Sequence, residues 1–163
     1  MRLFVAVYPP DDVRRDLRRR LTEAVAGRRV RLTAVEKWHV TLAFLGEVPA
    51  ERLPALEDAL GGVTVPRGRE LRLRGAGGFG GRVTWAGVEG DLAGLSERVR
   101  AAARQAGAPP DERPFTAHLT VMYAHDAAVS EALADYAGPP WALDGIALVR
   151  SDPGGAYTTL RTW

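Results

Sequence analysis

Two short stretches of the chain repeat one pattern, and this repeat constrains the fold more than any other feature. His39-Val40-Thr41-Leu42 and His118-Leu119-Thr120-Val121 each place a threonine two positions after a histidine, with apolar residues between and after them. In a β-strand, residues two positions apart point to the same face. Each stretch therefore predicts a strand that presents one imidazole and one hydroxyl on the same surface.

The spacing of the repeats indicates a duplicated architecture. From His39 to His118 is 79 positions, close to half of the 163 residues. We expect an α+β fold with two pseudo-symmetric lobes, each an antiparallel sheet with helices packed on its outer face. No linker-like segment separates the halves, so the prediction is a single bilobal domain over residues 1–163, with a groove between its lobes.

Hydrophobic periodicity gives the expected elements. It predicts strands at 2–8, 30–32, 39–45, 71–74, 82–88, 115–123, 141–149 and 156–163, and helices at 11–25, 51–60, 91–106 and 130–136. Asp11 or Asp12 is the expected cap of the first helix, and Ser130 the expected cap of the last. The glycine-rich segment 75–81 is interpreted as a flexible connection, since it lacks the lysine and the strand-to-helix setting of a phosphate-binding loop.

Strict alternation assigns a face to each residue of the two motif strands. On the first strand it places Ala43 on the histidine face and Phe44 in the core. On the second strand it places Met122 on the histidine face and points Tyr123 away from it. The two polar faces need a wet environment, and a cleft between the lobes provides one.

Composition excludes several classes of site. The chain has no cysteine, which removes disulfides and thiol catalysis, and two histidines without carboxylate or thiolate partners make a poor zinc site. We therefore expect no metal and no cofactor. The start of the chain does not resemble a signal peptide and no run is long enough to span a membrane, so we expect a cytoplasmic monomer with no membrane or protein partner.

The arginines and tryptophans each allow two interpretations. There are 21 arginines to one lysine and the formal net charge is only +2. The arginine run at 14–20 fits a solvated helix face, with an RNA contact as the alternative. The tryptophans fit packing, with base stacking as their alternative.

Paired imidazoles facing one cleft suit phosphoester cleavage. One imidazole takes a proton from an attacking water, and the other gives a proton to the departing oxygen. The hydroxyls of Thr41 and Thr120 can bind the non-bridging phosphate oxygens. The residues alone predict the pair of His39 and His118, but they do not decide which one is the acid.

These motifs resemble those of the two-histidine (2H) phosphoesterase superfamily, and most closely its RNA 2′,3′-cyclic phosphodiesterase branch, also called 2′-5′ RNA ligase-like. The resemblance extends from end to end of the chain. Its further segments are Arg2-Leu3-Phe4-Val5-Ala6, 38–46, Trp85-Ala86-Gly87-Val88, 148–151 and Gly154-Gly155-Ala156-Tyr157.

The resemblance implies metal-independent hydrolysis of a 2′,3′-cyclic phosphate at an RNA end, leaving a 2′-phosphate. It implies that His39 is the proton donor and His118 the proton acceptor. It also makes Arg2 and Phe4 of the opening strand, and Tyr123, candidate substrate contacts. Tyr123 stands where the family often has an arginine, and Ala43 where a lysine is common.

Two alternatives remain open beside RNA 3′ ends as the substrate. The same chemistry would act on another small cyclic phosphate, including a small cyclic nucleotide, or on a 2′-5′-linked oligonucleotide. A protein of another class, a non-catalytic module that binds RNA ends, would also present these residues in a groove. Turnover of a cyclic phosphate distinguishes the enzymes from the binding module.

Overall fold

The computed structural model describes residues 1–163 and contains two four-stranded antiparallel sheets. The first sheet has the order β2 (Val40–Glu47), β1 (Arg2–Val7), β7 (Ala147–Ser151), β8 (Tyr157–Thr162). The second has the order β5 (His118–Met122), β4 (Val83–Glu89), β3 (Glu70–Phe79), β6 (Trp141–Ala142). The predicted α+β class is confirmed, and each motif lies on an edge strand of its own sheet.

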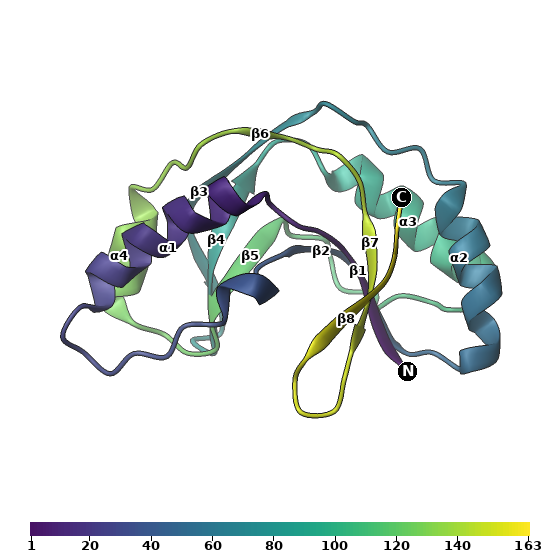
Figure 1. Cartoon of the computed structure of the whole chain (residues 1–163), viewed down its shortest axis with the longest axis horizontal. Coiled ribbons are helices and arrows are strands. Elements are labelled where there is room, and N and C mark those ends of the chain that lie inside the picture. Colours follow the sequence, from purple (N-terminus) through teal and green to yellow (C-terminus); the bar gives the residue numbers. More distant parts are fainter.

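Two helices accompany each sheet on the outside of the molecule (Figure 1). α2 (Leu53–Gly61) packs on α3 (Ala93–Gln105), which packs on β2, while α1 (Asp11–Val25) packs on α4 (Ala127–Ala134), which packs on β3. Short 3₁₀ turns, η1 (Val35–Lys37) and η2 (Ala50–Arg52), precede β2 and α2. No helix combines the length and the apolar character needed to cross a membrane.

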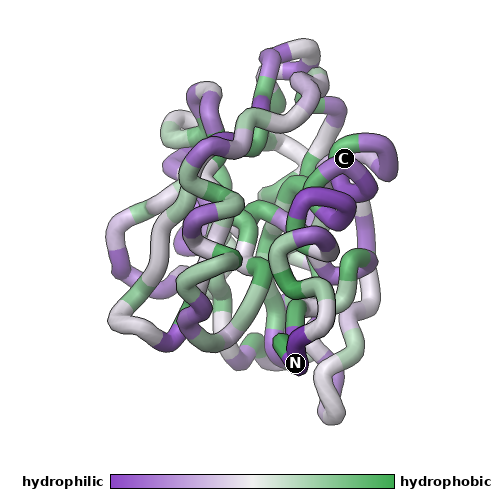
Figure 2. Tube along the Cα trace, turned by 90° about the vertical axis from the view of Figure 1, so that its left-hand side faces the viewer, coloured by the Kyte–Doolittle hydropathy of each residue, from purple (hydrophilic) through white to green (hydrophobic).

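The chain passes repeatedly from one lobe to the other. α1 follows β1 of the first sheet yet packs with the second lobe, and α3 follows β4 of the second sheet yet packs on β2. One cluster of 33 buried residues includes Leu42 of the first sheet and both Leu73 and Leu119 of the second. Figure 2 shows these hydrophobic strands inside a more hydrophilic periphery. Burial of this shared apolar surface holds the two lobes together.

Two β-bulges in β2 overturn the predicted faces of that strand. Against β1, Leu42 and Leu45 are each an extra residue without a partner in the register. An extra residue reverses the alternation beyond it. Ala43 is therefore 3% exposed in the core, whereas Phe44 is 45% exposed. The carbonyl of Leu42 accepts a hydrogen bond of 2.7 Å from the buried Ser96 hydroxyl of α3, which satisfies the backbone at the first bulge.

β5 contains one bulge with the same effect. Against β4, Thr120 pairs with Trp85 and Met122 pairs with Thr84, so Val121 is the extra residue. Met122 is therefore buried, contrary to the prediction, and Tyr123 is 70% exposed. The bulge brings Tyr123 to the same side of the strand as the histidine.

The glycine-rich segment 75–81 is largely strand and not a flexible connection. β3 continues to Phe79 and pairs with β4 through this segment. At Gly77 an added Cβ would lie 2.1 Å from the Trp85 ring, so only glycine lets the indole lie flat across the strand. The segment predicted as a flexible connection therefore provides the space in which the Trp85 ring packs.

Other local predictions fail for identifiable reasons. The predicted strand 30–32 is irregular. Its neighbour Thr33 makes one backbone hydrogen bond to the free edge of β5, from its amide to the Val121 carbonyl at 2.8 Å, and adds bonds from its hydroxyl. The segment 141–149 divides into β6 and β7, which belong to different sheets. Pro10, whose side chain makes no capping bond, precedes α1, and Asp126 in place of Ser130 caps α4 by accepting from the Val129 amide at 3.0 Å.

Candidate active site

A groove of about 2040 Å³ brings together every residue predicted for the site. β2 and β5, the edge strands that carry the motifs, contact each other across the two sheets. The groove lining includes both histidines and both threonines of the motifs, together with the three candidate substrate contacts: Arg2, Phe4, His39, Thr41, His118, Thr120 and Tyr123. The two motifs thus share one solvent-filled space.

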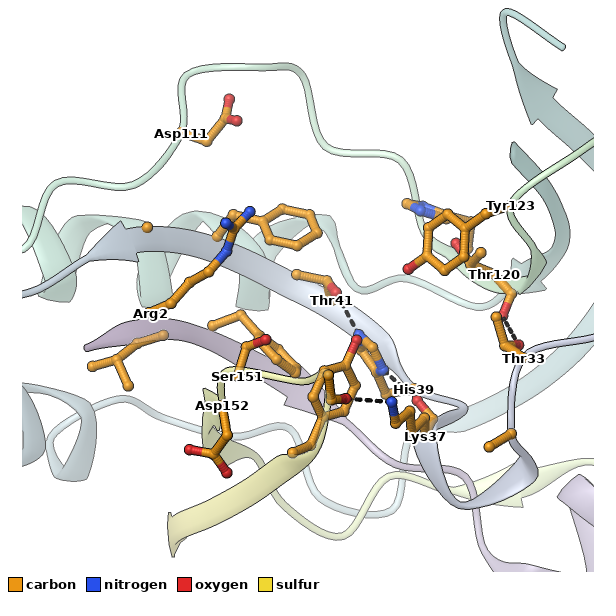
Figure 3. Close-up of a pocket in the computed structure, with 18 of the residues that line it drawn as sticks. Arg2, Thr33, Lys37, His39, Thr41, Asp111, Thr120, Tyr123, Ser151 and Asp152 are labelled. Carbon is orange, nitrogen blue, oxygen red and sulfur yellow. Dashed lines mark hydrogen bonds between the residues drawn. The ribbon is translucent and has the colours of Figure 1, made fainter. Parts of the chain in front are cut away.

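His39 lies just before β2 and both of its ring nitrogens have partners. Nδ1 lies 2.6 Å from the carbonyl oxygen of Lys37, and Nε2 lies 2.9 Å from the Thr41 hydroxyl (Figure 3). A carbonyl oxygen can only accept, so Nδ1 carries the proton and Nε2 of the neutral ring accepts from Thr41. The backbone thereby fixes the tautomer and turns Nε2 toward the groove.

His118 is the first residue of β5; its Nδ1 makes the same kind of backbone contact as that of His39, but its Nε2 differs. Its Nδ1 lies 2.6 Å from the carbonyl oxygen of Thr116, again two residues earlier. Its Nε2 has no hydrogen-bond partner in the protein, and the Thr120 hydroxyl does not reach it. The Thr120 carbonyl instead accepts from the Thr33 hydroxyl at 3.1 Å, which holds β5 from its free edge (Figure 3).

Aromatic side chains surround each imidazole. Phe4 stacks on His39 with ring centroids 4.8 Å apart, and Tyr157 meets the same ring edge-on at 5.6 Å. On the other side, Phe79 meets His118 edge-on at 5.0 Å, and Trp85 lies 5.5 Å away. These contacts restrict the rotation of both imidazoles.

Both imidazoles favour the neutral form in the empty groove. Burial lowers the pKa of His39 below its usual value; the Lys37 carbonyl opposes this shift and the nearby His118 adds to it. Burial also lowers the pKa of His118, against the effect of the Thr116 carbonyl. A phosphate anion between the rings would favour their protonated forms.

Several groove residues were not predicted from the sequence. Tyr157 of β8 approaches Tyr123 from the opposite lobe; burial and this neighbour raise the pKa of Tyr157. Lys37 sits over the Tyr157 ring at 5.1 Å and donates to the Gly155 carbonyl. His125, predicted as a loop residue, does lie in the loop after β5 and also lines the groove. No group of three or more His, Asp or Glu side chains could hold a metal ion.

Comparison with known proteins identifies the family. A model described as LigT-like phosphoesterase matches residues 7–85 and 86–157, with one histidine motif in each segment. The chain belongs to the LigT-like phosphoesterase family. The 2H resemblance predicted from the motifs is thereby confirmed.

Three relatives of this LigT-like chain share one name. The RNA 2′,3′-cyclic phosphodiesterase of Archaeoglobus fulgidus is 38% identical over 74% of this chain and 71% of its own length. That of Thermus thermophilus is 34% identical over 98% and 88%. That of Escherichia coli is 36% identical over 74% and 70%.

Solved structures of the same fold cover the whole chain. TT0787 of Thermus thermophilus superposes with a TM-score of 0.81 at 31% identity, covering 100% of this chain and 97% of that one. E. coli LigT complexed with 3′-AMP superposes with a TM-score of 0.81 at 28% identity, covering 99% and 96%. LigT has also been solved with phosphate, at a TM-score of 0.76 and 27% identity, covering 99% and 95%.

Proposed function

We propose that this protein hydrolyses the 2′,3′-cyclic phosphate at an RNA 3′ end to a 2′-phosphate, without a metal ion, using His39 as proton donor and His118 as proton acceptor. One observation carries the proposal. Two imidazoles, each held through Nδ1 by the carbonyl two residues earlier, line one groove. The names of the relatives supply the RNA end as substrate.

The proposed reaction is one displacement at phosphorus. Nε2 of His118 takes a proton from a water molecule as its oxygen attacks phosphorus. The bond between phosphorus and the 3′ oxygen breaks, and protonated His39 gives its Nε2 proton to that oxygen. One water is consumed, the phosphate stays on the 2′ oxygen, and proton exchange with solvent restores both imidazoles.

The surroundings of the two rings support this division of roles. Nε2 of His118 has no protein partner, so a water molecule can occupy its acceptor position. Nε2 of His39 already lies beside Thr41, whose hydroxyl can rotate to accept when the ring is protonated. Ready access to water suits the acceptor, and a fixed direction suits the donor.

Other groove residues have supporting roles in the proposal. The hydroxyls of Thr41 and Thr120 bind non-bridging phosphate oxygens, and the Phe4 ring holds His39 in place by stacking. Arg2 is an exposed cation on the groove and Tyr123 is an exposed hydroxyl beside it. Each provides a hydrogen-bond donor for the substrate.

We also propose that the chain works as one bilobal domain, a cytoplasmic monomer acting on RNA 3′ ends or small cyclic nucleotides. The exchange of α1 and α3 between the lobes and the shared core support the single domain. Separate expression of either half would leave apolar surface of that core exposed.

The direct test is hydrolysis of adenosine 2′,3′-cyclic phosphate in the presence of a chelator. We expect the 2′-phosphate as the only product, and a loss of about 10³-fold in kcat for His39→Ala and for His118→Ala, since each removes one proton-transfer group. If wild type turns over and both variants keep its rate, the mechanism is wrong. If wild type binds a cyclic-phosphate RNA end without hydrolysing it, the binding-module alternative replaces the enzyme. If the protein hydrolyses only 2′-5′ linkages or only non-nucleotide cyclic phosphates, that compound class replaces the RNA 3′ end as the proposed substrate.

A further inference from the structure

Phe44 is an unusual residue for the middle of a strand. Its neighbours Ala43 and Leu45 are both buried, yet the first bulge of β2, at Leu42, turns Phe44 out into the groove, where its side chain is 45% exposed. Exposing a phenylalanine ring gives up the burial that normally stabilises a strand of this kind. An aromatic face held open in a groove is a surface on which a nucleobase can stack.

The loop at 109–113 holds a guanidinium beside this ring. The guanidinium carbon of Arg113 lies 5.8 Å from the centre of the Phe44 ring. Asp111 fixes that arginine by accepting from both its Nε and its backbone amide at 2.8 Å. The amide of Asp111 in turn donates to the Phe44 carbonyl at 2.8 Å. The ring and the planar cation are therefore anchored to one another, and both can stack on a base.

The position of Phe44 indicates which nucleotide would reach it. The Phe4 ring neighbours both, with centroids 4.8 Å from His39 and 6.4 Å from Phe44, whereas Phe44 makes no ring contact with the imidazole itself. A nucleotide whose phosphate lies at His39 occupies the space next to Phe4. A base on Phe44 then belongs to the neighbouring nucleotide.

A cation lines the groove beyond the Phe4–Phe44 pair, because Arg2 pairs with Glu47 in the register of β1 and β2. Arg2 is exposed, forms none of the protein's ion pairs, and extends from β1 toward the loop that carries Asp111 (Figure 3). It is also near enough to Tyr157 for its charge to act on that hydroxyl. A guanidinium at this place can bind the phosphodiester that joins the two nucleotides. The groove volume of about 2040 Å³ exceeds the roughly 300–1,000 Å³ of sites that hold one small ligand.

We propose that the groove binds at least two nucleotides, and that Phe44 with Arg113 forms the subsite for the base of the nucleotide that precedes the cyclic phosphate. This inference rests on the proposed function and specifies its substrate as an RNA chain end. A mononucleotide cyclic phosphate would fill only the part of the groove between the histidines.

The experiment compares two substrates, adenosine 2′,3′-cyclic phosphate and the dinucleotide ApA with a terminal 2′,3′-cyclic phosphate. For wild type we expect kcat/KM to be at least about tenfold higher for the dinucleotide, because one stacked base contributes that much. Phe44→Ala should bring the two values together by raising KM for the dinucleotide. Its kcat/KM for the mononucleotide should stay within about twofold of wild type, since only the second base is lost.

Matched variants separate stacking from folding and from charge. Phe44→Trp keeps an aromatic face and should retain the dinucleotide preference, whereas Phe44→Leu keeps an apolar side chain and should lose it. Arg113→Ala should lower the preference, and Arg104→Ala on the outer helix α3 should not. Equal kcat/KM for both substrates in wild type, or an unchanged preference in Phe44→Ala, would overturn the subsite while leaving hydrolysis intact. Absence of hydrolysis of either substrate would instead overturn the proposed function.

Discussion

The histidines of the two motifs have the same hydrogen-bond partner at Nδ1, which faces the backbone, and different surroundings at Nε2, which faces the groove. At Nδ1, both His39 and His118 meet the carbonyl oxygen of the residue two positions earlier, at 2.6 Å in each case. At Nε2, His39 is paired with Thr41 and His118 has no partner. The repeated sequence thus sets the tautomer of both rings, and the surroundings distinguish their roles.

The neighbouring aromatic residues extend this difference. His39 is stacked under Phe4, a side chain of the adjacent strand β1 whose burial is nearly complete. His118 lies against Phe79 and Trp85 of the β3–β4 hairpin, and Phe79 is itself substantially exposed. A duplicated motif can therefore serve an asymmetric reaction, because each copy is inserted into a different packing environment.

The largest expected contrast concerns the two threonines. Thr120→Val should lower kcat/KM about tenfold, the value of one hydrogen bond to a charged phosphate. Thr41→Val should lower it about 50-fold, since that hydroxyl also orients His39. Steady-state kinetics on a cyclic nucleotide measure both. Equal losses would mean that the Thr41 contact with His39 has no part in catalysis.

A smaller effect is expected from Gly77, which affects only the His118 side. An added Cβ would meet the Trp85 ring at 2.1–2.4 Å and push the indole toward the imidazole. Gly77→Ala should lower kcat about tenfold, a loss of the order expected when a positioned group is displaced. Combining it with Trp85→Phe, which removes the clashing atoms, should restore most of the loss.

The control for this prediction is Gly62→Ala, because a Cβ at that glycine meets only ordinary van der Waals contact. Its kcat should match wild type. Two results would show that the Trp85 indole does not position His118. One is a full kcat in Gly77→Ala. The other is a double variant that is folded by circular dichroism but does not recover kcat.

The smallest expected effect is a shift of the pH at which kcat/KM is highest, to a value below the ordinary pKa of histidine. The acceptor must be neutral and the donor protonated, so kcat/KM falls below the acceptor's pKa and above the donor's pKa. Burial lowers the pKa of both histidines from the ordinary 6.5. The maximum of kcat/KM should therefore lie below pH 6.5, and His125→Ala should leave it in place. A maximum above pH 7.5 would contradict the buried, neutral imidazoles described above.

Much of this architecture follows from local patterns in the sequence. Alternation in 2–8 and the stripe of Val13, Leu17 and Leu21 locate β1 and α1 correctly, because one side of each element must be buried. The motif spacing brings His39 and His118 into one groove. The elements β1 and α1 depend on residues close in sequence, so a local pattern reveals them, whereas the shared groove was inferred from the repetition of the motif.

Features that depend on distant residues were not predictable in this way. The bulges of β2 and β5 are residues skipped in the pairing with β1 and β4. That pairing is made with distant parts of the chain, so no local sequence pattern marks the register. Ala43, Phe44, Met122 and Tyr123 were therefore assigned to the wrong faces. Gly77 was assigned to a flexible connection, since its role depends on Trp85, which lies on the neighbouring strand.

The division of roles between the two histidines can be tested with a modified leaving group. In a 2′,3′-cyclic phosphate with sulfur at the 3′ bridging position, the departing thiolate needs no proton, because thiols are far more acidic than alcohols. We predict that His39→Ala hydrolyses this substrate within about tenfold of wild type, whereas His118→Ala keeps its full deficit of about 10³-fold. Equal deficits in both variants, or recovery of His118→Ala in place of His39→Ala, would contradict the account.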